Sequence, residues 1–244
     1  MATVLVTGGS RGLGAAICRE AAMRGHDVCF SYQSRDDAAE EVATAVRKNG
    51  RKAVPVRADL RRDADVAKLF EAARDAFGGL DALVNNAGIT GPTGYFETTA
   101  QADIDAVIDV NLLGAMRCVR GALPLMAGRE NACIVNITSG AAQSGSPGRY
   151  VGYAASKAGL ETFTRGLAAE LAPKGIRVNA VSPGVSDTDM HDASAGSEKR
   201  MRLERSIPLG RMARPEEIAH PVLWLMSAEA SYVTGAVIRA SGGR

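Results

Sequence analysis

Short apolar runs alternate with longer amphipathic stretches along the whole chain, and this alternation is what most narrows the possible folds. Several runs carry apolar side chains at adjacent positions, which indicates strands buried on both faces of a parallel sheet. A repeated strand–helix–strand order gives right-handed crossovers and places helices on both sides of such a sheet. We therefore expect an α/β fold, a doubly wound parallel sheet of about seven strands. The expected strands are Thr3–Thr7, Asp27–Ser31, Ala53–Arg57, Ala82–Asn85, Cys133–Thr138, Arg177–Ser182 and Ala236–Arg239.

Three of the helical segments have recognisable ends. Asp63 is expected to cap a helix that runs to Phe77 with apolar side chains on one face. A second helix is expected over 152–171, and Pro215, followed by two glutamates, should open a third. The length of 244 residues, without a linker, repeat or low-complexity tract, indicates a single domain over residues 1–244.

The stretch Val185–Ser206 differs from the rest of the chain because it is polar, rich in small residues and placed directly after a strand. Ligands bind at the carboxyl edge of a doubly wound sheet, and surface loops there often carry function. We therefore expect residues 185–206 to form a lid over a substrate. His191 in this stretch is a weak candidate for a substrate contact.

Charge and cysteine content exclude several classes of function. The net charge is only +2 and no long basic run occurs, which argues against nucleic acid or an anionic membrane as partner. The four cysteines form no C-x-x-C pair and no cluster with zinc-ligand spacing, so no metal site is expected. They read as free buried thiols of a cytoplasmic protein. No apolar stretch approaches the ~20 residues that a membrane span requires.

Glycines cluster in the turn after the first expected strand, in the sequence Thr7-Gly8-Gly9-Ser10-Arg11-Gly12-Leu13-Gly14. Glycine permits positive φ and close backbone approach. The helix that follows would offer free N–H groups and a positive dipole end to a pyrophosphate. The spacing is G-x-x-x-G-x-G, not the G-x-G-x-x-G dinucleotide fingerprint, and no Gly-Lys-Ser/Thr of a phosphate-transfer loop follows. A plain strand–helix loop is the alternative interpretation.

This turn resembles the opening motif T-G-x-x-x-G-x-G of the short-chain dehydrogenase/reductase family, whose domain is a Rossmann fold. Further motifs of the family match at Ala58-Asp59-Leu60, at Asn85-Asn86-Ala87-Gly88 and at Pro183-Gly184 with Thr188. The resemblance implies a nicotinamide cofactor, with Asp59 at the adenine amino group and Thr188 near the nicotinamide carboxamide. Ser186 departs from the aliphatic residue usual at its position. The implied cofactor-binding residues are Gly8, Ser10, Arg11, Gly12, Leu13, Gly14, Ser34, Arg35, Asp59, Leu60, Asn86, Ala87, Gly88, Tyr153, Lys157, Pro183, Gly184 and Thr188.

The end of the second strand bears on the choice between NAD and NADP. An acidic residue there would bind the ribose hydroxyls and repel a 2′-phosphate, and none occurs before Asp36. Arg11 and Arg35 supply guanidinium groups that suit a phosphate, and the family associates both features with NADP. The basic residue often found where Gln33 stands is missing. We expect NADP, with NAD as the alternative and a solvated surface charge as the alternative role of Arg35.

Tyr153 and Lys157 are four residues apart near the start of an expected helix, so the ammonium should lie near the phenol. A free Tyr pKa of about 10 is too high for a base at neutral pH, and a nearby cation would lower it. The pattern Y-x-x-x-K is common by chance, but here it follows a strand that ends at Ser139. The Ser139 hydroxyl could hold a carbonyl oxygen as it gains charge. Tyr150 has no lysine four residues on.

The family resemblance completes the catalytic set with Asn111, whose amide is expected to hold a water that links Lys157 to solvent. The alternative is an ordinary capping or mid-helix asparagine of a helix over 111–127. Tyr153 follows Ser139 by 14 residues, one more than the family's commonest spacing, so one extra loop residue is expected. The implied catalytic residues are Asn111, Ser139, Tyr153 and Lys157. They imply an enzyme that transfers a hydride between NADP(H) and a carbonyl or alcohol, with Tyr153 as general acid and base.

Three interpretations of the function remain open. The first is a reductase or dehydrogenase of small free carbonyls or alcohols. The second is a 3-oxoacyl-[acyl-carrier-protein] reductase, which would need a basic rim for its carrier; the candidates are Arg129, Arg149, Arg165 and Lys174. The third is a non-catalytic NADP(H)-binding sensor. The family usually forms dimers or tetramers through helices near 100–127 and 152–172, so a homotetramer is expected; Ser241, where the family usually has Asp, bears on that assembly.

Overall fold

The computed structural model describes residues 2–187 and 197–244. Its centre is a seven-stranded parallel sheet in the order β3-β2-β1-β4-β5-β6-β7. The doubly wound fold predicted from the sequence is confirmed, and each predicted strand is found with both ends within one residue. The strands are β1 Thr3–Val6, β2 Asp27–Tyr32, β3 Ala53–Arg57, β4 Ala82–Asn85, β5 Cys133–Ile137, β6 Arg177–Pro183 and β7 Val237–Ala240.

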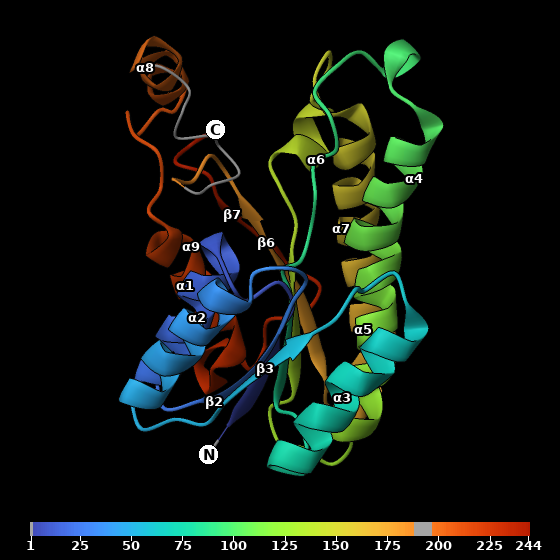
Figure 1. The fold of residues 1–244 in the computed structure, drawn as a ribbon, viewed down its shortest axis with the longest axis vertical. Coiled ribbons are helices and arrows are strands. Elements are labelled where there is room, and N and C mark those ends of the chain that lie inside the picture. Colours follow the sequence, from blue (N-terminus) through green and yellow to red (C-terminus); the bar gives the residue numbers. More distant parts are fainter. Residues whose placement is uncertain (1, 188–196) are drawn as a thin grey trace.

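Helices cover both faces of the sheet (Figure 1). One face carries α1 Gly12–Met23, α2 Asp36–Lys48 and α9 Pro215–Met226. The other carries α3 Asp63–Phe77, α4 Gln101–Ile108, α5 Gly114–Met126 and α7 Val151–Leu171. Shorter pieces complete the chain: the one-turn α6 Ala141–Ser144, α8 Ser197–Arg205, the 3-10 turns Phe96–Thr98, Ala172–Lys174 and Ala228–Ala230, and a π turn at Asp109–Leu113.

Strand side chains alternate between two separate hydrophobic cores. Val4 and Val6 of β1 belong to the core under α1, α2 and α9, whereas Leu5 belongs to the core under α3, α5 and α7. Successive side chains of a strand point to opposite faces, so a strand with helices on both sides needs apolar residues at adjacent positions. Burial of each such side chain contributes about 1.5–3 kcal/mol.

Two helix starts differ from the sequence-based expectation. Asp63 is the first residue of α3 rather than its cap, and the cap position is held by Arg62, which makes no side-chain cap hydrogen bond. The Asp63 carboxylate instead lies 3.0 Å from Nε of Arg117 in an ion pair. The helix expected over 111–127 is interrupted at its start, because the π turn precedes α5. The starts of α7 and α9 agree with the prediction to within one residue.

The C-terminal segment packs against the chain that follows α8. The amide of Leu209 donates to the carbonyl of Gly242 over 3.1 Å. Gly242 and Gly243 both have positive φ, and a Cβ on Gly243 would lie 3.0 Å from Pro208. Figure 1 shows α8 and the C-terminus at one end of the molecule and the N-terminus at the other.

The expected lid is described only in part. At its start, the amide of Asp187 donates to the carbonyl of Ala213, and the amide of Ala213 donates to the carbonyl of Val185, so the two segments are joined. Within the same range, residues 197–205 form α8. Thr188 and His191 lie outside the described residues.

All four cysteines are buried and free, as expected: Cys18, Cys29, Cys118 and Cys133. Within residues 2–187 and 197–244, no group of three or more metal-binding side chains is present. Among the helices the structure describes, none has the length and apolar character needed to cross a bilayer.

Candidate active site

The glycine turn between β1 and α1 is closely packed at the carboxyl edge of the sheet. A Cβ on Gly14 would lie only 2.1 Å from the carbonyl oxygen of Gly8 and 2.6 Å from Nδ2 of Asn86. Gly8 itself has φ +66°, which glycine adopts without strain. Residues with side chains at these two positions would push the turn open, so the glycines fix its shape.

The segment after β4 holds this turn in place. The Thr7 hydroxyl oxygen accepts hydrogen bonds of 3.0 Å from the amides of Asn86 and Ala87. In return, Nδ2 of Asn86 donates to the carbonyls of Thr7 (2.9 Å) and Gly8 (3.1 Å). The structure thus brings together two of the motifs found in the sequence, and it leaves the backbone of Gly88 beside the catalytic candidates.

The N-terminus of α1 fits an anionic group. Arg11 occupies the cap position with an extended backbone and makes no side-chain cap hydrogen bond, so the cap residue leaves the first amides of the helix available. Those amides and the positive end of the helix dipole favour a phosphate. Together with the packed glycine turn, this is the kind of surface on which the pyrophosphate of a dinucleotide can lie close to the backbone.

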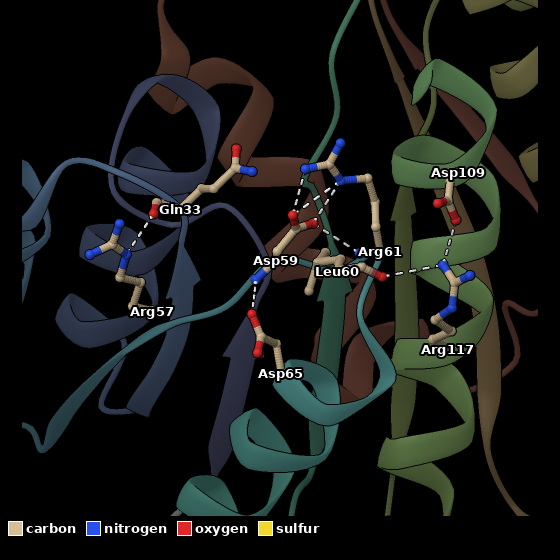
Figure 2. A network of polar contacts seen from close by, with 8 residues as sticks. All are labelled: Gln33, Arg57, Asp59, Leu60, Arg61, Asp65, Asp109 and Arg117. Carbon is tan, nitrogen blue, oxygen red and sulfur yellow. Dashed lines mark hydrogen bonds and ion pairs between the residues drawn. The ribbon is translucent and has the colours of Figure 1, made fainter. Parts of the chain in front are cut away.

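The residues expected on the adenosine side already have partners. Arg35 donates from Nε and Nη2 to both carboxylate oxygens of Asp37, at 3.0 and 2.9 Å, in an exposed pair. Asp59 is held by Arg61, with a shortest distance of 2.6 Å, and this pairing lowers the pKa of Asp59. Figure 2 shows the Asp59–Arg61 pair at the end of β3. Arg61 is a neighbour that the sequence analysis did not single out.

Ser139 and Tyr153 meet as predicted. Ser139 follows β5, Tyr153 lies in the first turn of α7, and the Ser139 hydroxyl is close enough to the phenol to lower the pKa of Tyr153. The long spacing between them is taken up by α6 and by Gly145, which ends α6 with φ +70°. Tyr150, the other tyrosine nearby, accepts a hydrogen bond of 2.8 Å from the hydroxyl of Thr93 instead.

Lys157 lies one helical turn after Tyr153 and is buried, with 3 % of its surface exposed. Its Nζ donates to the carbonyl of Ile137 over 2.7 Å and lies 5.9 Å from the centre of the Tyr153 ring. Burial lowers the pKa of Lys157 from 10.5 to about 8. The predicted proximity of ammonium and phenol is therefore present.

The expected effect of Lys157 on the tyrosine is not found in this structure. Burial raises the pKa of Tyr153 above its ordinary value, and the hydrogen bond from Ser139 opposes this only in part. The reason is that the ammonium is directed at the carbonyl of Ile137 and not at the phenol. The protonated tyrosine is consequently the stable form here, which suits a proton donor rather than a base.

Asn111 lies in the π turn and is 1 % exposed. Its Nδ2 donates to the carbonyl of Ile89 (2.9 Å) and to the hydroxyl of Ser156 (3.0 Å), while its Oδ1 accepts from the amide of Ile89 (2.8 Å). Both amide hydrogens are thus used within the protein, and only the carbonyl oxygens of Asn111 could accept a bond from water. The site for a Cβ on Gly88 lies 3.2 Å from Oδ1 of Asn111 and 3.4 Å from Nζ of Lys157, so both side chains end beside this glycine.

Ser156 is a positioning residue that the sequence analysis missed. It is fully buried, accepts from Asn111 and donates to the carbonyl of Tyr153 over 2.7 Å. It therefore joins the π turn to the first turn of α7. A small polar residue directly before Lys157 was the available signal, but nothing in its spacing indicated a partner 45 residues away.

The segment after β6 closes the site next to Ser139. The amide of Gly140 donates to the carbonyl of Pro183 over 3.0 Å, and the amide of Gly184 donates to the carbonyl of Ala240 over 2.9 Å. A Cβ on Gly184 would lie 2.6 Å from Cα of Ser241, so glycine is required there. Pro183 and Gly184 thus lie at the same edge as the glycine turn, as predicted.

A family model described as enoyl-(acyl carrier protein) reductase, which represents short-chain dehydrogenases/reductases, matches residues 8–244. The chain belongs to the short-chain dehydrogenase/reductase family. This membership makes it an oxidoreductase with a site for a nicotinamide cofactor.

The relatives within the family include an uncharacterized oxidoreductase and two enzymes that are named for different substrates. The chain is 42 % identical to the uncharacterized oxidoreductase YgfF of Escherichia coli, with all of both chains covered. It is 40 % identical to 3beta-hydroxysteroid dehydrogenase 1 of Eggerthella lenta, covering 99 % of this chain and 92 % of the relative. It is 37 % identical to a 3-oxoacyl-[acyl-carrier-protein] reductase of Staphylococcus epidermidis, covering 99 % and 98 %.

Solved short-chain dehydrogenases/reductases have the same fold. A short-chain dehydrogenase/reductase from Serratia marcescens is 36 % identical and superimposes with a TM-score of 0.93, covering 99 % of this chain and 97 % of the other. A short-chain dehydrogenase from Burkholderia cenocepacia, solved in complex with NADP, is 34 % identical with a TM-score of 0.92 and the same coverage.

Proposed function

We propose that this short-chain dehydrogenase/reductase transfers a hydride between NADP(H) and a carbonyl or alcohol, with Tyr153 as the general acid and base. The observation that carries the proposal is the placement of the Ser139 and Tyr153 hydroxyls beside the buried Lys157, whose Nζ lies 5.9 Å from the centre of the Tyr153 ring. Two hydroxyl donors converge there at the carboxyl edge of the sheet, where the glycine turn also lies. Such a pair can stabilise a carbonyl oxygen as negative charge develops on it.

The cofactor site is supported by the packed glycine turn and the uncapped N-terminus of α1. When bound, the nicotinamide supplies or accepts the hydride. The turn and the α1 amides would hold the pyrophosphate, Asp59 and Leu60 the adenine, and Lys157 the nicotinamide ribose. Pro183 and Gly184 would border the nicotinamide; Thr188 is proposed there from the sequence alone. The whole proposed set is Gly8, Ser10, Arg11, Gly12, Leu13, Gly14, Ser34, Arg35, Asp59, Leu60, Asn86, Ala87, Gly88, Tyr153, Lys157, Pro183, Gly184 and Thr188.

Each catalytic side chain has a separate task in the reduction. Ser139 donates a hydrogen bond to the substrate oxygen, and Tyr153 donates a second one and then its proton. The raised pKa of Tyr153 keeps that proton in place until the oxygen becomes basic. Lys157 supplies positive charge near the phenolate that remains. Asn111 would accept a water through a carbonyl oxygen and so connect Lys157 with solvent.

NADP is preferred over NAD because no carboxylate follows directly after β2 and because two arginines lie nearby. Arg11 is exposed at the start of α1, whereas the Arg35 guanidinium forms an ion pair with Asp37. The solved Burkholderia cenocepacia relative, which binds NADP, supports the same choice.

A cavity beside Tyr153 favours a substrate with an apolar group. Its lining includes Phe96, Ile104 and Val151 together with Tyr150, so an apolar group of the substrate could contact these side chains. Arg149 also borders the cavity, and its guanidinium lies over the Tyr150 ring, 5.8 Å from its centre. This cation and the 3-oxoacyl-[acyl-carrier-protein] reductase among the relatives support an acyl thioester as a second candidate substrate.

The decisive experiment follows NADPH and NADH consumption against a panel of carbonyls. The panel contains acetoacetyl-coenzyme A with and without acyl carrier protein, ethyl acetoacetate, a steroid 3-ketone and an aromatic aldehyde. Tyr153→Phe should lose nearly all turnover and keep its NADPH affinity, with Tyr232→Phe, at a fully exposed position, as the matched control that stays active. Equal activity of Tyr153→Phe and the wild-type chain would overturn the assignment, and tight NADPH binding without turnover of any carbonyl would favour the sensor.

Assembly and location are proposed from the exposed apolar side chains and from the state of the cysteines. Leu113 and Val151 are large apolar side chains exposed on the face of α4, α5 and α7, which supports a homotetramer or dimer through these helices. Light scattering of the purified chain tests this directly. The four free, buried cysteines agree with a reducing compartment, so we propose that the enzyme acts in the cytoplasm.

A further inference from the structure

Arg117 of α5 connects three segments that meet at the carboxyl edge of the sheet (Figure 2). Its Nη1 donates to the Asp109 carboxylate over 2.7 Å and to the main-chain carbonyl of Leu60 over 3.3 Å. Its Nε lies 3.0 Å from the carboxylate of Asp63. None of the four residues belongs to the proposed catalytic set. Two of the segments they come from, however, contain residues proposed to bind the cofactor or to take part in catalysis.

The first of these segments follows β3. It contains Asp59 and Leu60, which are proposed to hold the adenine, and it is short and irregular before α3 begins. The carbonyl of Leu60 is the group on this segment that Arg117 contacts. A movement of the segment on cofactor binding would therefore change the hydrogen bond between the Leu60 carbonyl and the Arg117 guanidinium.

The second segment is the π turn at Asp109–Leu113, which begins with the other acceptor of Arg117 and contains Asn111. The amide of Gly114 donates to the carbonyl of Asp109, five residues back. Such wide turns are rare and less regular than α-helix. If the turn became regular α-helix, its extra residue would be lost, and the Asn111 side chain would rotate around the helix axis by about 100°, the angle of one residue. The turn therefore needs an anchor at its start, and the Asp109–Arg117 ion pair supplies one.

Gly114 brings the two segments into contact one helical turn before Arg117. A Cβ on Gly114 would lie 3.1 Å from Cβ of Leu60 and 3.3 Å from the carbonyl of Asp109. Both contacts of α5 with Leu60 thus lie on the same helix face. The segment after β3 therefore packs on the first residue of α5, directly after the π turn, and Arg117 binds both segments one turn further along.

We propose that Arg117 is a positioning residue that couples the adenine side of the cofactor site to Asn111 by holding Leu60 and Asp109 together. This inference rests on the proposed function, because it assigns Leu60 to the adenine and Asn111 to the proton path. The guanidinium suits the task because its planar fork fixes several acceptors at once, whereas an ammonium would act as a single point charge. The Asp63 carboxylate is 91 % exposed and contributes little to the coupling.

Hydrogen–deuterium exchange tests the coupling without any carbonyl substrate. We would measure exchange of the amides of residues 109–116 with and without saturating NADPH, in the wild-type chain and in Arg117→Gln, Arg117→Lys, Asp109→Asn and Asp63→Asn. Asp63→Asn is the matched control, because it removes a partner of the same guanidinium that lies outside the π turn. Thermal unfolding of each variant shows whether it remains folded.

We expect NADPH to protect these amides in the wild-type chain and in Asp63→Asn. Arg117→Gln and Asp109→Asn should lose most of this protection, and the dissociation constant of NADPH should rise by about three- to tenfold. Arg117→Lys should be intermediate. In a carbonyl assay, kcat of the two uncoupled variants should fall and its solvent deuterium isotope effect should rise, since proton delivery becomes slower.

Two failures are distinguishable. Protection in Arg117→Gln equal to that in the wild-type chain, while both bind NADPH, overturns the coupling and leaves the proposed function intact. Loss of protection in Asp63→Asn to the same degree as in Asp109→Asn would show a general loosening and would also overturn it. A wild-type chain that binds neither NADPH nor NADH overturns the proposed function, and the coupling with it.

Discussion

The ammonium of Lys157 donates a hydrogen bond of 2.7 Å to the main-chain carbonyl of Ile137, at the end of β5. This bond ties the first turns of α7 to the central sheet and holds a charged group in a place where almost no solvent reaches it. The cost of that burial is seen in the lysine pKa, which falls from 10.5 to about 8. Keeping this charged group in the proposed active site therefore lowers the free energy of unfolding.

Lys157→Met should therefore raise the free energy of unfolding at neutral pH by roughly 2 kcal/mol. Removing the buried charge should stabilise the folded chain by about 3 kcal/mol. Loss of the hydrogen bond to Ile137 should reduce this gain by about 1 kcal/mol. Between pH 8 and 10.5 the unfolded chain binds more protons at this lysine than the folded chain, so wild-type stability rises with pH and the difference shrinks. Urea unfolding at several pH values measures this. Lys48→Met, on the exposed end of α2, is the control and should change stability little; a less stable Lys157→Met at neutral pH would contradict the prediction.

Carbonyl reduction should decline as the pH rises through about 8. Tyr153 keeps its proton over this range because burial raises its pKa. The alkaline limb of the pH–rate profile is therefore expected from loss of the Lys157 proton. The rate should be highest on the acid side of this value and fall on the alkaline side. A kcat profile between about pH 6 and pH 10 checks it. Lys157→Arg, if it retains activity, should move the limb to higher pH, and a limb at the same pH in that variant would assign it to another group.

Gly14→Ala should disturb both folding and cofactor binding, because the new methyl would meet the Gly8 carbonyl at 2.1 Å. A clash with backbone is relieved only by moving the turn, at about 1–3 kcal/mol of stability. The dissociation constant of NADPH, followed by its fluorescence, should rise at least tenfold, of the order of 1.4 kcal/mol. Ala45→Gly in α2 separates the two effects, since it should lose about 1 kcal/mol of stability with unchanged NADPH affinity.

Arg11→Gln should weaken NADPH binding about tenfold and leave NADH binding nearly unchanged, because a phosphate contact of this kind is charge-assisted. Arg35→Gln should have a smaller effect, since its guanidinium is already bound by both oxygens of Asp37. Asp37→Asn should tighten NADPH binding by making Arg35 more available. Titrations of both dinucleotides measure these changes. A larger loss in Arg35→Gln than in Arg11→Gln would reverse the assignment of the 2′-phosphate site.

The regular part of the fold was predictable from local patterns. The strand ends follow from where adjacent apolar residues stop, since both faces of the sheet are covered. The glycine turn and Asn86 were predictable as motifs, and their packing explains the motif: Gly14 leaves no room for a side chain between Gly8 and Asn86. Tyr153 and Ser139 could be paired because each follows a recognisable element.

The remaining features depend on contacts between distant segments. The π turn around Asn111 has the composition of an ordinary helix, and its extra residue is stabilised by Ile89 and Ser156 from other parts of the chain. The role of Arg117 depends on three acceptors from two other segments. The direction of the Tyr153 pKa shift could not be read from a neighbouring lysine alone, because burial and the Ile137 carbonyl decide it. Asp63 was misjudged as a cap because Arg117 binds it instead.

The packing of the C-terminal segment has a practical consequence for anyone who purifies this protein. The carbonyl of Gly242 accepts a hydrogen bond from the amide of Leu209, four residues after the end of α8. An affinity tag fused to Arg244 would strain this contact and so disturb the segment that directly follows residues 185–206, the expected lid. A tag at the other terminus lies at the far end of the molecule, away from the cofactor and the tyrosine. Kinetic constants from C-terminally tagged material would therefore describe the fusion rather than the enzyme.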